Sequence, residues 1–125
     1  MRRRSRRALW PLLVVLVGAP LAPQVASAEP PLTPAQRRGA RVLFDEADKL
    51  MDGERWADAL AKLESLVTSY KAAETPAVMF YTGLCKSNLG RLRDALRDYE
   101  RARVMLAADT KSPARERKAL EDKLG

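Results

Sequence analysis

A pattern of small and apolar residues recurs in this chain after 36 residues, and this repeat restricts the fold more than any other feature of the sequence. Repeats of roughly 20 to 50 residues are typical of stacked supersecondary units. A glycine precedes each copy, at Gly53 and at Gly90. The matching residues are Trp56, Ala59, Leu60 and Leu63 in the first copy and Leu92, Ala95, Leu96 and Tyr99 in the second. We therefore predict an array of similar units.

Helical periodicity predicts what these units are made of. Apolar residues recur at intervals of three and four, which is typical of amphipathic helices. Threonine followed by proline marks two predicted helix starts, Thr33-Pro34 and Thr75-Pro76, and Gln36 completes a capping box at the first. Ser112-Pro113 predicts a third start of the same kind. The predicted helices span about residues 34–51, 54–70, 76–89, 91–108 and 114–124.

The second copy resembles the tetratricopeptide repeat, in which small residues let the two helices of a hairpin approach closely. The residues that carry this resemblance are Met79, Gly83, Ala95, Tyr99 and Ala102 in the second copy, and Leu43, Ala47, Leu50, Trp56, Ala59 and Leu63 in the first. Lys86 departs from the pattern, because the family usually has a large apolar residue there. The resemblance implies an all-α fold, with antiparallel helix hairpins forming a short α-solenoid and a C-terminal capping helix.

The resemblance also implies a peptide-binding groove on the inner face of the solenoid. Family members form this face from the first helix of each hairpin. The corresponding residues here are Arg41, Phe44, Asp48, Met51, Phe80, Leu84, Ser87 and Asn88. In an alternative interpretation, the aromatic residues among them only hold the hairpins together. Recognition of a free C-terminal carboxylate is not expected, because Phe44, Asp48 and Tyr81 stand where the family's lysines and asparagines would be needed.

The N-terminal 28 residues have the order of a secretory signal peptide. Five arginines precede an apolar run from Ala8 to Leu21, and Ala26-Ser27-Ala28 supplies small residues for cleavage. Prolines interrupt the run and it is shorter than the roughly 20 residues of a spanning helix, so we expect cleavage rather than a retained membrane anchor. Sec and twin-arginine export both fit. The predicted division is a leader (1–28), an extended lead-in (29–33), two hairpins (34–109) and a capping helix (110–125).

Charge and composition bear on the partner class. The chain has 23 basic and 16 acidic residues and a net charge of +7. Loss of the five leader arginines reduces the charge to about +2, with both signs interspersed along the helices. Nucleic-acid binding usually requires basic residues gathered on one face, so we do not predict a nucleic-acid partner. We expect export, most simply to the bacterial periplasm.

Catalytic chemistry is not predicted. The chain has no histidine and a single cysteine, Cys85, which we interpret as a small apolar packing residue. Four acidic residues cluster between Asp45 and Asp52, but Arg41 and Lys49 lie at the same helical spacing, so a solvated helix face is the preferred interpretation. We find no phosphate loop or nucleophile motif, and we predict no metal and no cofactor.

These observations predict a non-catalytic protein–protein interaction module that binds a protein or peptide and has no stable membrane anchor after cleavage. Two alternatives belong to other classes. Two hairpins are fewer than the three repeats that arrays usually need, so a homodimer that self-assembles through the solenoid ends is the first alternative. An enzyme that uses Asp45, Asp48 or Asp52 is the second, and the lack of a matched acid–base pair argues against it.

Overall fold

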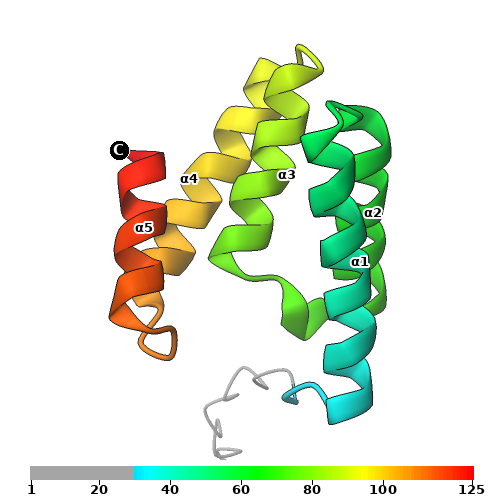
Figure 1. Ribbon diagram of the computed structural model, residues 1–125. Coiled ribbons are helices and arrows are strands. Elements are labelled where there is room, and N and C mark those ends of the chain that lie inside the picture. The colour runs from blue at the N-terminus through cyan, green and yellow to red at the C-terminus, as the bar shows by residue number, and fades with distance from the viewer. Residues whose placement is uncertain (1–29) are drawn as a thin grey trace, which may run out of the picture.

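The computed structural model describes residues 30–125, so the predicted leader and its cleavage site lie outside the described residues. All regular structure in residues 30–125 is helical, which confirms the all-α prediction. None of these helices is long and apolar enough to span a membrane. The elements are α1 (Pro34–Asp52), α2 (Trp56–Ser69), the 3₁₀ turn η1 (Lys71–Ala73), α3 (Pro76–Asn88), α4 (Leu92–Ala108) and α5 (Ala114–Leu124) (Figure 1).

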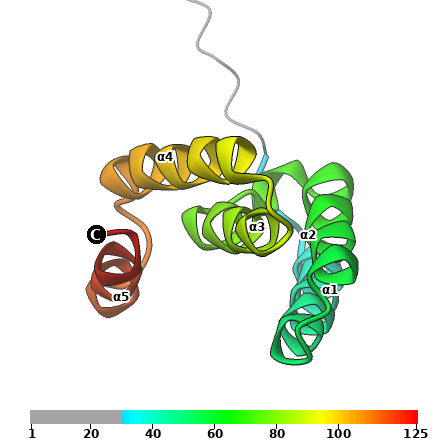
Figure 2. The same cartoon turned by 90° about the horizontal axis from the view of Figure 1, so that it is seen from above.

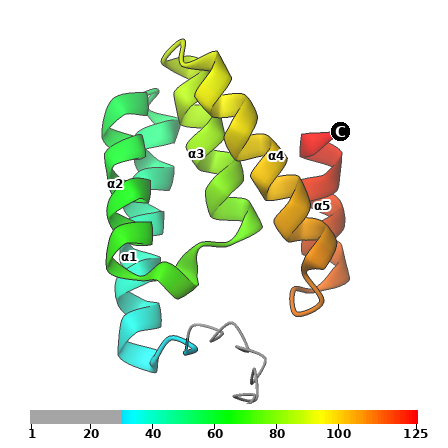
Figure 3. The ribbon, with the colours of Figure 1, turned by 180° about the vertical axis from the view of Figure 1, so that it is seen from behind.

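The helices form two antiparallel hairpins and one additional helix. α1 packs against α2, α3 packs against α4, and α3 also contacts α2, which joins the hairpins (Figure 3). α5 lies beside α4. Seen from above, α1, α3 and α5 line one side of the molecule, and α2 and α4 lie behind them (Figure 2). This is the arrangement of a short solenoid whose inner side is made by alternate helices.

The first and third helices start where the threonine-proline pairs predict. Thr33 Oγ1 accepts a hydrogen bond from the Gln36 amide at 3.2 Å, and the Thr33 amide donates to Gln36 Oε1 at 2.9 Å, which completes the capping box. Thr75 Oγ1 accepts from the Val78 amide at 3.2 Å. A proline stands at the start of each of these two helices.

The predicted start of α5 is wrong in detail. Pro113 is the N-cap rather than the first helical residue, and the Ser112 side chain does not cap the helix. The Asp109 carboxylate instead accepts hydrogen bonds from the amides of Lys111 and Ser112, at 3.0 and 3.1 Å. A hydrogen bond from the Ser112 hydroxyl, followed by these two amides, holds the pKa of Asp109 below its ordinary value. The carboxylate therefore organises the turn from outside the helix.

The two hairpin turns follow one backbone course, but the glycines are not equivalent. Gly53 and Leu89 end α1 and α3 with nearly the same conformation, φ −86° in both. The next residue takes the left-handed conformation, Glu54 with φ 57° and Gly90 with φ 79°. Pairing Gly53 with Gly90 is therefore wrong by one residue, because Glu54 is the equivalent of Gly90. Glu54 adopts the left-handed conformation although it has a side chain, whereas glycine adopts this conformation without steric cost.

The residues assigned to repeat packing lie in or beside the core. Small residues allow close approach in the second hairpin, where a methyl group on Gly83 would lie 2.9 Å from Tyr99 Cε1. The half-buried members of the set are Leu43, Leu50, Trp56 and Tyr99. The buried members are Ala47, Ala59, Leu63, Met79, Gly83, Ala95 and Ala102.

Lys86, the departure from the repeat pattern, forms an ion pair between α3 and α4. Its Nζ lies 2.7 Å from Asp98 Oδ2, and the two side chains are only 16% and 13% exposed. Asp98 is supplied by the second helix of the same hairpin. A charged pair thus replaces the apolar contact that the family pattern places there.

Candidate functional site

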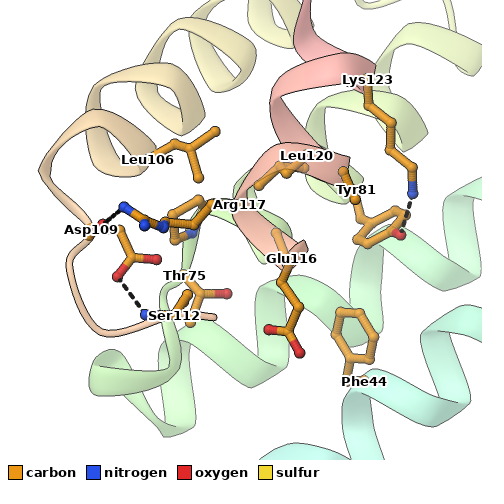
Figure 4. Close-up of a pocket in the computed structure, with 13 residues that line it drawn as sticks. Phe44, Thr75, Tyr81, Leu106, Asp109, Ser112, Glu116, Arg117, Leu120 and Lys123 are labelled. Carbon is orange, nitrogen blue, oxygen red and sulfur yellow. Dashed lines mark hydrogen bonds between the residues drawn. The ribbon is translucent and has the colours of Figure 1, made fainter. Parts of the chain in front are cut away.

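The inner side of the molecule contains a pocket of about 400 Å³ between α1, α3 and α5. α3 forms its floor, Phe44 of α1 stands at one side, and α5 closes the other (Figure 4). Most of the lining is apolar. The lining residues are Phe44, Thr75, Pro76, Ala77, Tyr81, Leu106, Asp109, Ser112, Glu116, Arg117, Ala119, Leu120 and Lys123.

A row of aromatic rings runs from this pocket into the second hairpin. The Phe44 and Tyr81 rings meet edge to face with centroids 5.7 Å apart, and Phe80 and Tyr81 do the same at 5.3 Å. Phe80 in turn packs on Tyr99 at 5.6 Å. Such pairs contribute about 0.5–1.5 kcal/mol each beyond their buried area. The row therefore connects α1, α3 and α4 and fixes the floor of the pocket.

Lys123 brings a positive charge from α5 to the edge of this row. Its Nζ donates a hydrogen bond to the Tyr81 hydroxyl at 3.2 Å and lies 5.4 Å and 5.9 Å from the ring centroids of Tyr81 and Phe80 (Figure 4). Among residues 30–125, no carboxylate lies within ion-pair distance of this ammonium group. Lys123 is exposed, so its charge is available at the mouth of the pocket.

Arg117 lies deeper in the same wall. One guanidinium nitrogen, Nη1, donates to the Asp109 carbonyl oxygen at 3.1 Å, which ties α5 to the end of α4. The Nε atom is buried and has no hydrogen-bond partner among the described residues. The pocket thus combines an apolar interior with charged side chains of both signs, the cations of Arg117 and Lys123 and the carboxylates of Asp109 and Glu116.

The structure brings only part of the predicted groove to the pocket. Phe44 lines it, and Phe80 belongs to the aromatic row. Met51 is buried in the core between α1 and α2, because the end of α1 turns that side chain toward Leu60 and Leu63. Its placement in an open groove is therefore wrong.

The other predicted groove residues lie on the inner helices away from the pocket. Arg41 and Asp48 are exposed on α1, and Arg41 pairs with Asp45 at 3.1 Å. Asn88 donates from its side chain to the Leu84 carbonyl oxygen at 2.9 Å and so closes the end of α3. Leu84 and Ser87 are half-buried.

The α5 wall is the part of the site that the sequence prediction missed. The sequence predicts a capping helix for the segment that contains Arg117, Leu120 and Lys123, and the structure adds that these three residues line the pocket. Their spacing, with Leu120 three residues from each of the two cations, places all three on one side of a helix and was visible in the sequence. The sequence prediction places Tyr81, which lies on the floor, on the inner face only as a residue that does not fit a carboxylate clamp, and does not count it among the groove residues.

Reactive groups are not gathered in this region. Cys85 is fully buried in the core cluster against which Phe44 and Tyr81 pack, and burial raises the pKa of its thiol from 9.0 to about 11. Within residues 30–125, no three acidic, histidine or cysteine side chains are close enough together to hold a metal ion. In the acidic cluster of α1, Glu46 is paired with Lys62 of α2 at 2.7 Å.

Comparison with known proteins identifies the family. A search of curated proteins and a search of solved structures each gave no match. A family model described as "Bacterial transcriptional activator domain" matches residues 17–124. This is a family of non-catalytic regulatory domains with a helical architecture like that of tetratricopeptide repeats, and it is distinct from the tetratricopeptide repeat family that the sequence resembles. The chain belongs to the bacterial transcriptional activator domain family.

Proposed function

We propose that this protein is an adaptor that binds a peptide segment of another protein on its inner side. The observation that carries the proposal is the apolar pocket of about 400 Å³ between α1, α3 and α5. Binding sites of this size usually combine an apolar lining with a few well-placed polar groups. An apolar side chain of the bound segment would enter between Phe44 and Leu120 and rest on Tyr81. The wider groove, with Arg41, Asp48, Phe80, Leu84, Ser87 and Asn88, would hold the flanking residues.

The charges at the pocket indicate which segment fits best. Lys123 has no carboxylate partner within ion-pair distance, and the buried Arg117 Nε has no hydrogen-bond partner in the part of the chain that the structure describes. A carboxylate next to the apolar anchor would pair with the exposed Lys123 ammonium at the mouth of the pocket, whereas Asp109 and Glu116 already place carboxylates in the pocket lining beside Arg117. We therefore expect a segment with an aliphatic or aromatic residue and an acidic side chain close to it.

The place of action is part of this proposal. The predicted leader favours export, with the adaptor acting on envelope proteins in the periplasm, without a nucleic-acid partner and without a stable membrane anchor. The family's name favours a second candidate, an intracellular role in transcriptional activation through protein contacts. The same groove serves either role, so the identity of the partner distinguishes them.

Filling the pocket from its exposed edge tests the proposal. Ala119 lines the pocket and is exposed, so Ala119→Trp should block the pocket without disturbing the core. Ala57→Trp is the matched control, because Ala57 is exposed on α2 and does not line the inner pocket. Both variants and the parent protein are used for affinity capture from an extract of the host, with mass-spectrometric identification of the bound proteins.

The proposal expects a stoichiometric partner that the parent and Ala57→Trp retain and that Ala119→Trp loses. Equal retention by Ala119→Trp would place the partner elsewhere and contradict the proposal. If the captured material contains only further copies of this protein, and the protein has the mass of a dimer in solution, the result would instead support self-assembly through the solenoid ends.

A further inference from the structure

The N-terminal half of α4 leaves two leucines uncovered. Leu92 and Leu96 are 66% and 61% exposed, although the neighbouring side of the same helix is packed against α3 and buries Ala95 and Ala102. We call these two residues the leucine stripe. In the first hairpin the residues at the same repeat positions are Trp56, which is half-buried, and Leu60, which is 6% exposed in a core cluster shared with Cys85 of α3. An apolar position that α3 helps to cover on α2 is therefore bare on α4.

The position of α5 explains why the stripe is bare. Leu92, Leu96, Tyr99, Arg103 and Leu106 follow one another at intervals of four and three residues, which places them along one side of α4. α5 contacts only the C-terminal part of that side, where Arg103 Nη2 donates to the Leu124 carbonyl oxygen at 2.8 Å. Leu96 lies seven residues earlier, about two helical turns beyond this contact. The stripe thus continues, toward the start of α4, the side of that helix against which α5 packs, and α5 lies along the C-terminal part of α4 (Figure 3).

The charges around the stripe are mostly positive. Three of the other charged side chains of α4 are paired, Asp98 with Lys86, Arg101 with Glu74, and Asp94 with Arg91, and Arg103 donates to the Leu124 carbonyl oxygen. Arg93 has no ion pair within residues 30–125, and Arg97 has only a loose contact of 3.8 Å with Asp94 while its side chain is 81% exposed. The one acidic neighbour without a pair among the described residues is Glu100, at the C-terminal end of the stripe. Two exposed arginines therefore flank the stripe on one side.

We infer that the leucine stripe is a second docking surface, separate from the inner pocket, and that it binds an acidic amphipathic helix of a partner protein. The helix would take the place on α4 that α3 takes on α2, with apolar residues on Leu92 and Leu96 and carboxylates toward Arg93 and Arg97. A second copy of this chain fits less well. Two-fold pairing through so short a stripe would bring the arginines of both copies to the same rim, where like charges repel.

Designed peptides test this inference directly. The probe is a helical peptide of about 18 residues, with leucines along one side and glutamates on the flank, and its counterpart carries lysine in place of each glutamate. Each is titrated into the ¹⁵N-labelled protein, expressed from the full chain, while amide signals are followed by NMR. We expect the glutamate peptide to shift the amides of residues 91–97 saturably, and the lysine peptide to leave them in place.

Variants of the protein separate the contribution of the leucines to peptide binding from that of the arginines. Leu92→Ser with Leu96→Ser should weaken binding of the glutamate peptide by at least about tenfold, because two apolar contacts are lost. Val104→Ser, at a position 69% exposed and away from the stripe, is the matched control and should bind like the parent. Arg93→Glu with Arg97→Glu should reverse the preference, so that the lysine peptide binds more tightly.

Several outcomes would overturn the inference. One is the absence of saturable shifts in residues 91–97, and another is equal binding of the two peptides to the parent protein. Changes in amide signals that are confined to the pocket residues would show that the peptide binds on the inner side and that α4 is not a docking surface. Self-association that Leu96→Ser abolishes would assign the stripe to a second copy, and binding of anionic lipid vesicles in place of the peptide would assign it to a membrane surface.

Discussion

Glu54 and Gly90 occupy equivalent points of the two hairpin turns, and they show how one residue determines the local backbone energy. Both have positive φ, and the left-handed conformation costs a residue with a side chain roughly 1–2 kcal/mol. Glycine adopts it without that cost. The sequence indicated both turns through their glycines, but it did not show that the left-handed residue of the first turn is the glutamate after Gly53.

Glu54→Gly should therefore stabilise the protein. We expect the free energy of unfolding to rise by roughly 0.5–1 kcal/mol, the relief of strain being partly offset by the greater freedom of glycine in the unfolded chain. Gly90→Ala should lower it by about 1 kcal/mol, since no atom lies within 4 Å of the added methyl and only the backbone conformation is affected. Urea unfolding of both variants measures the changes. Stabilisation by Gly90→Ala would contradict the assignment of strain to these positions.

Cys85 gives the stability of the protein a dependence on alkaline pH. Burial raises its pKa from 9.0 to about 11, so between these values the unfolded chain releases the thiol proton while the folded chain retains it. The free energy of unfolding should then be unaffected by this group below pH 9 and should fall by roughly 2–3 kcal/mol as the pH rises to 11.

The comparison that isolates this effect is Cys85→Ala. Burial also raises the pKa of Tyr99, which lowers stability at alkaline pH in the same direction and remains in both proteins, whereas the smaller rise that the charge of Cys85 adds to the Tyr99 pKa is lost together with the thiol. Urea unfolding at pH 8, 9, 10 and 11 should give a shallower decline for Cys85→Ala than for the parent. Parallel declines in the two proteins would show that the thiol does not contribute.

Between elements, the Lys86–Asp98 ion pair is the contact that the repeat pattern alone does not predict. The pattern places an apolar residue at position 86, and only the packing of α3 on α4 brings the carboxylate to it. The periodicity and spacing of the sequence predict the helices, their pairing in two hairpins and the close contact at Gly83. They do not predict the role of α5, because its charged sequence suits a cap and a pocket wall equally.

Asp98→Asn tests what this pair does for the packing of α3 on α4. The change leaves a largely buried ammonium without its counter-charge, which should cost about 1–3 kcal/mol of stability. Replacing both partners, Lys86→Met with Asp98→Leu, should cost much less or stabilise, because the apolar contact of the family pattern is restored.

The surface pair of Arg41 and Asp45 is the control for that measurement. Its side chains are 77% and 53% exposed, so Arg41→Ala should change the free energy of unfolding by no more than about 0.5 kcal/mol. Thermal or urea unfolding of the variants gives the comparison. A double variant less stable than Asp98→Asn would show that the pair stabilises the hairpin beyond avoiding an isolated charge.

For the whole molecule, the first 28 residues and the folded part lead to different expectations. The arginine-rich start, the apolar run and Ala26-Ser27-Ala28 predict a cleaved leader, whereas the family match begins at residue 17, within that segment. Thr33 makes the first capping contacts of α1, and Leu32 packs against the core cluster at the start of that helix.

The decisive measurement is the intact mass of the protein recovered from a bacterial host after the outer membrane has been opened and, separately, after lysis. We expect a chain that begins at Glu29 in the first fraction, lighter than the 13.9 kDa of the full sequence. Ala28→Asp removes the small residue that cleavage requires, so this variant should retain the leader and stay with the membrane. The full-length mass in the lysate alone would reject the leader. The adaptor would then act where transcription occurs, and the partners of the pocket and of the leucine stripe would have to be sought among intracellular proteins.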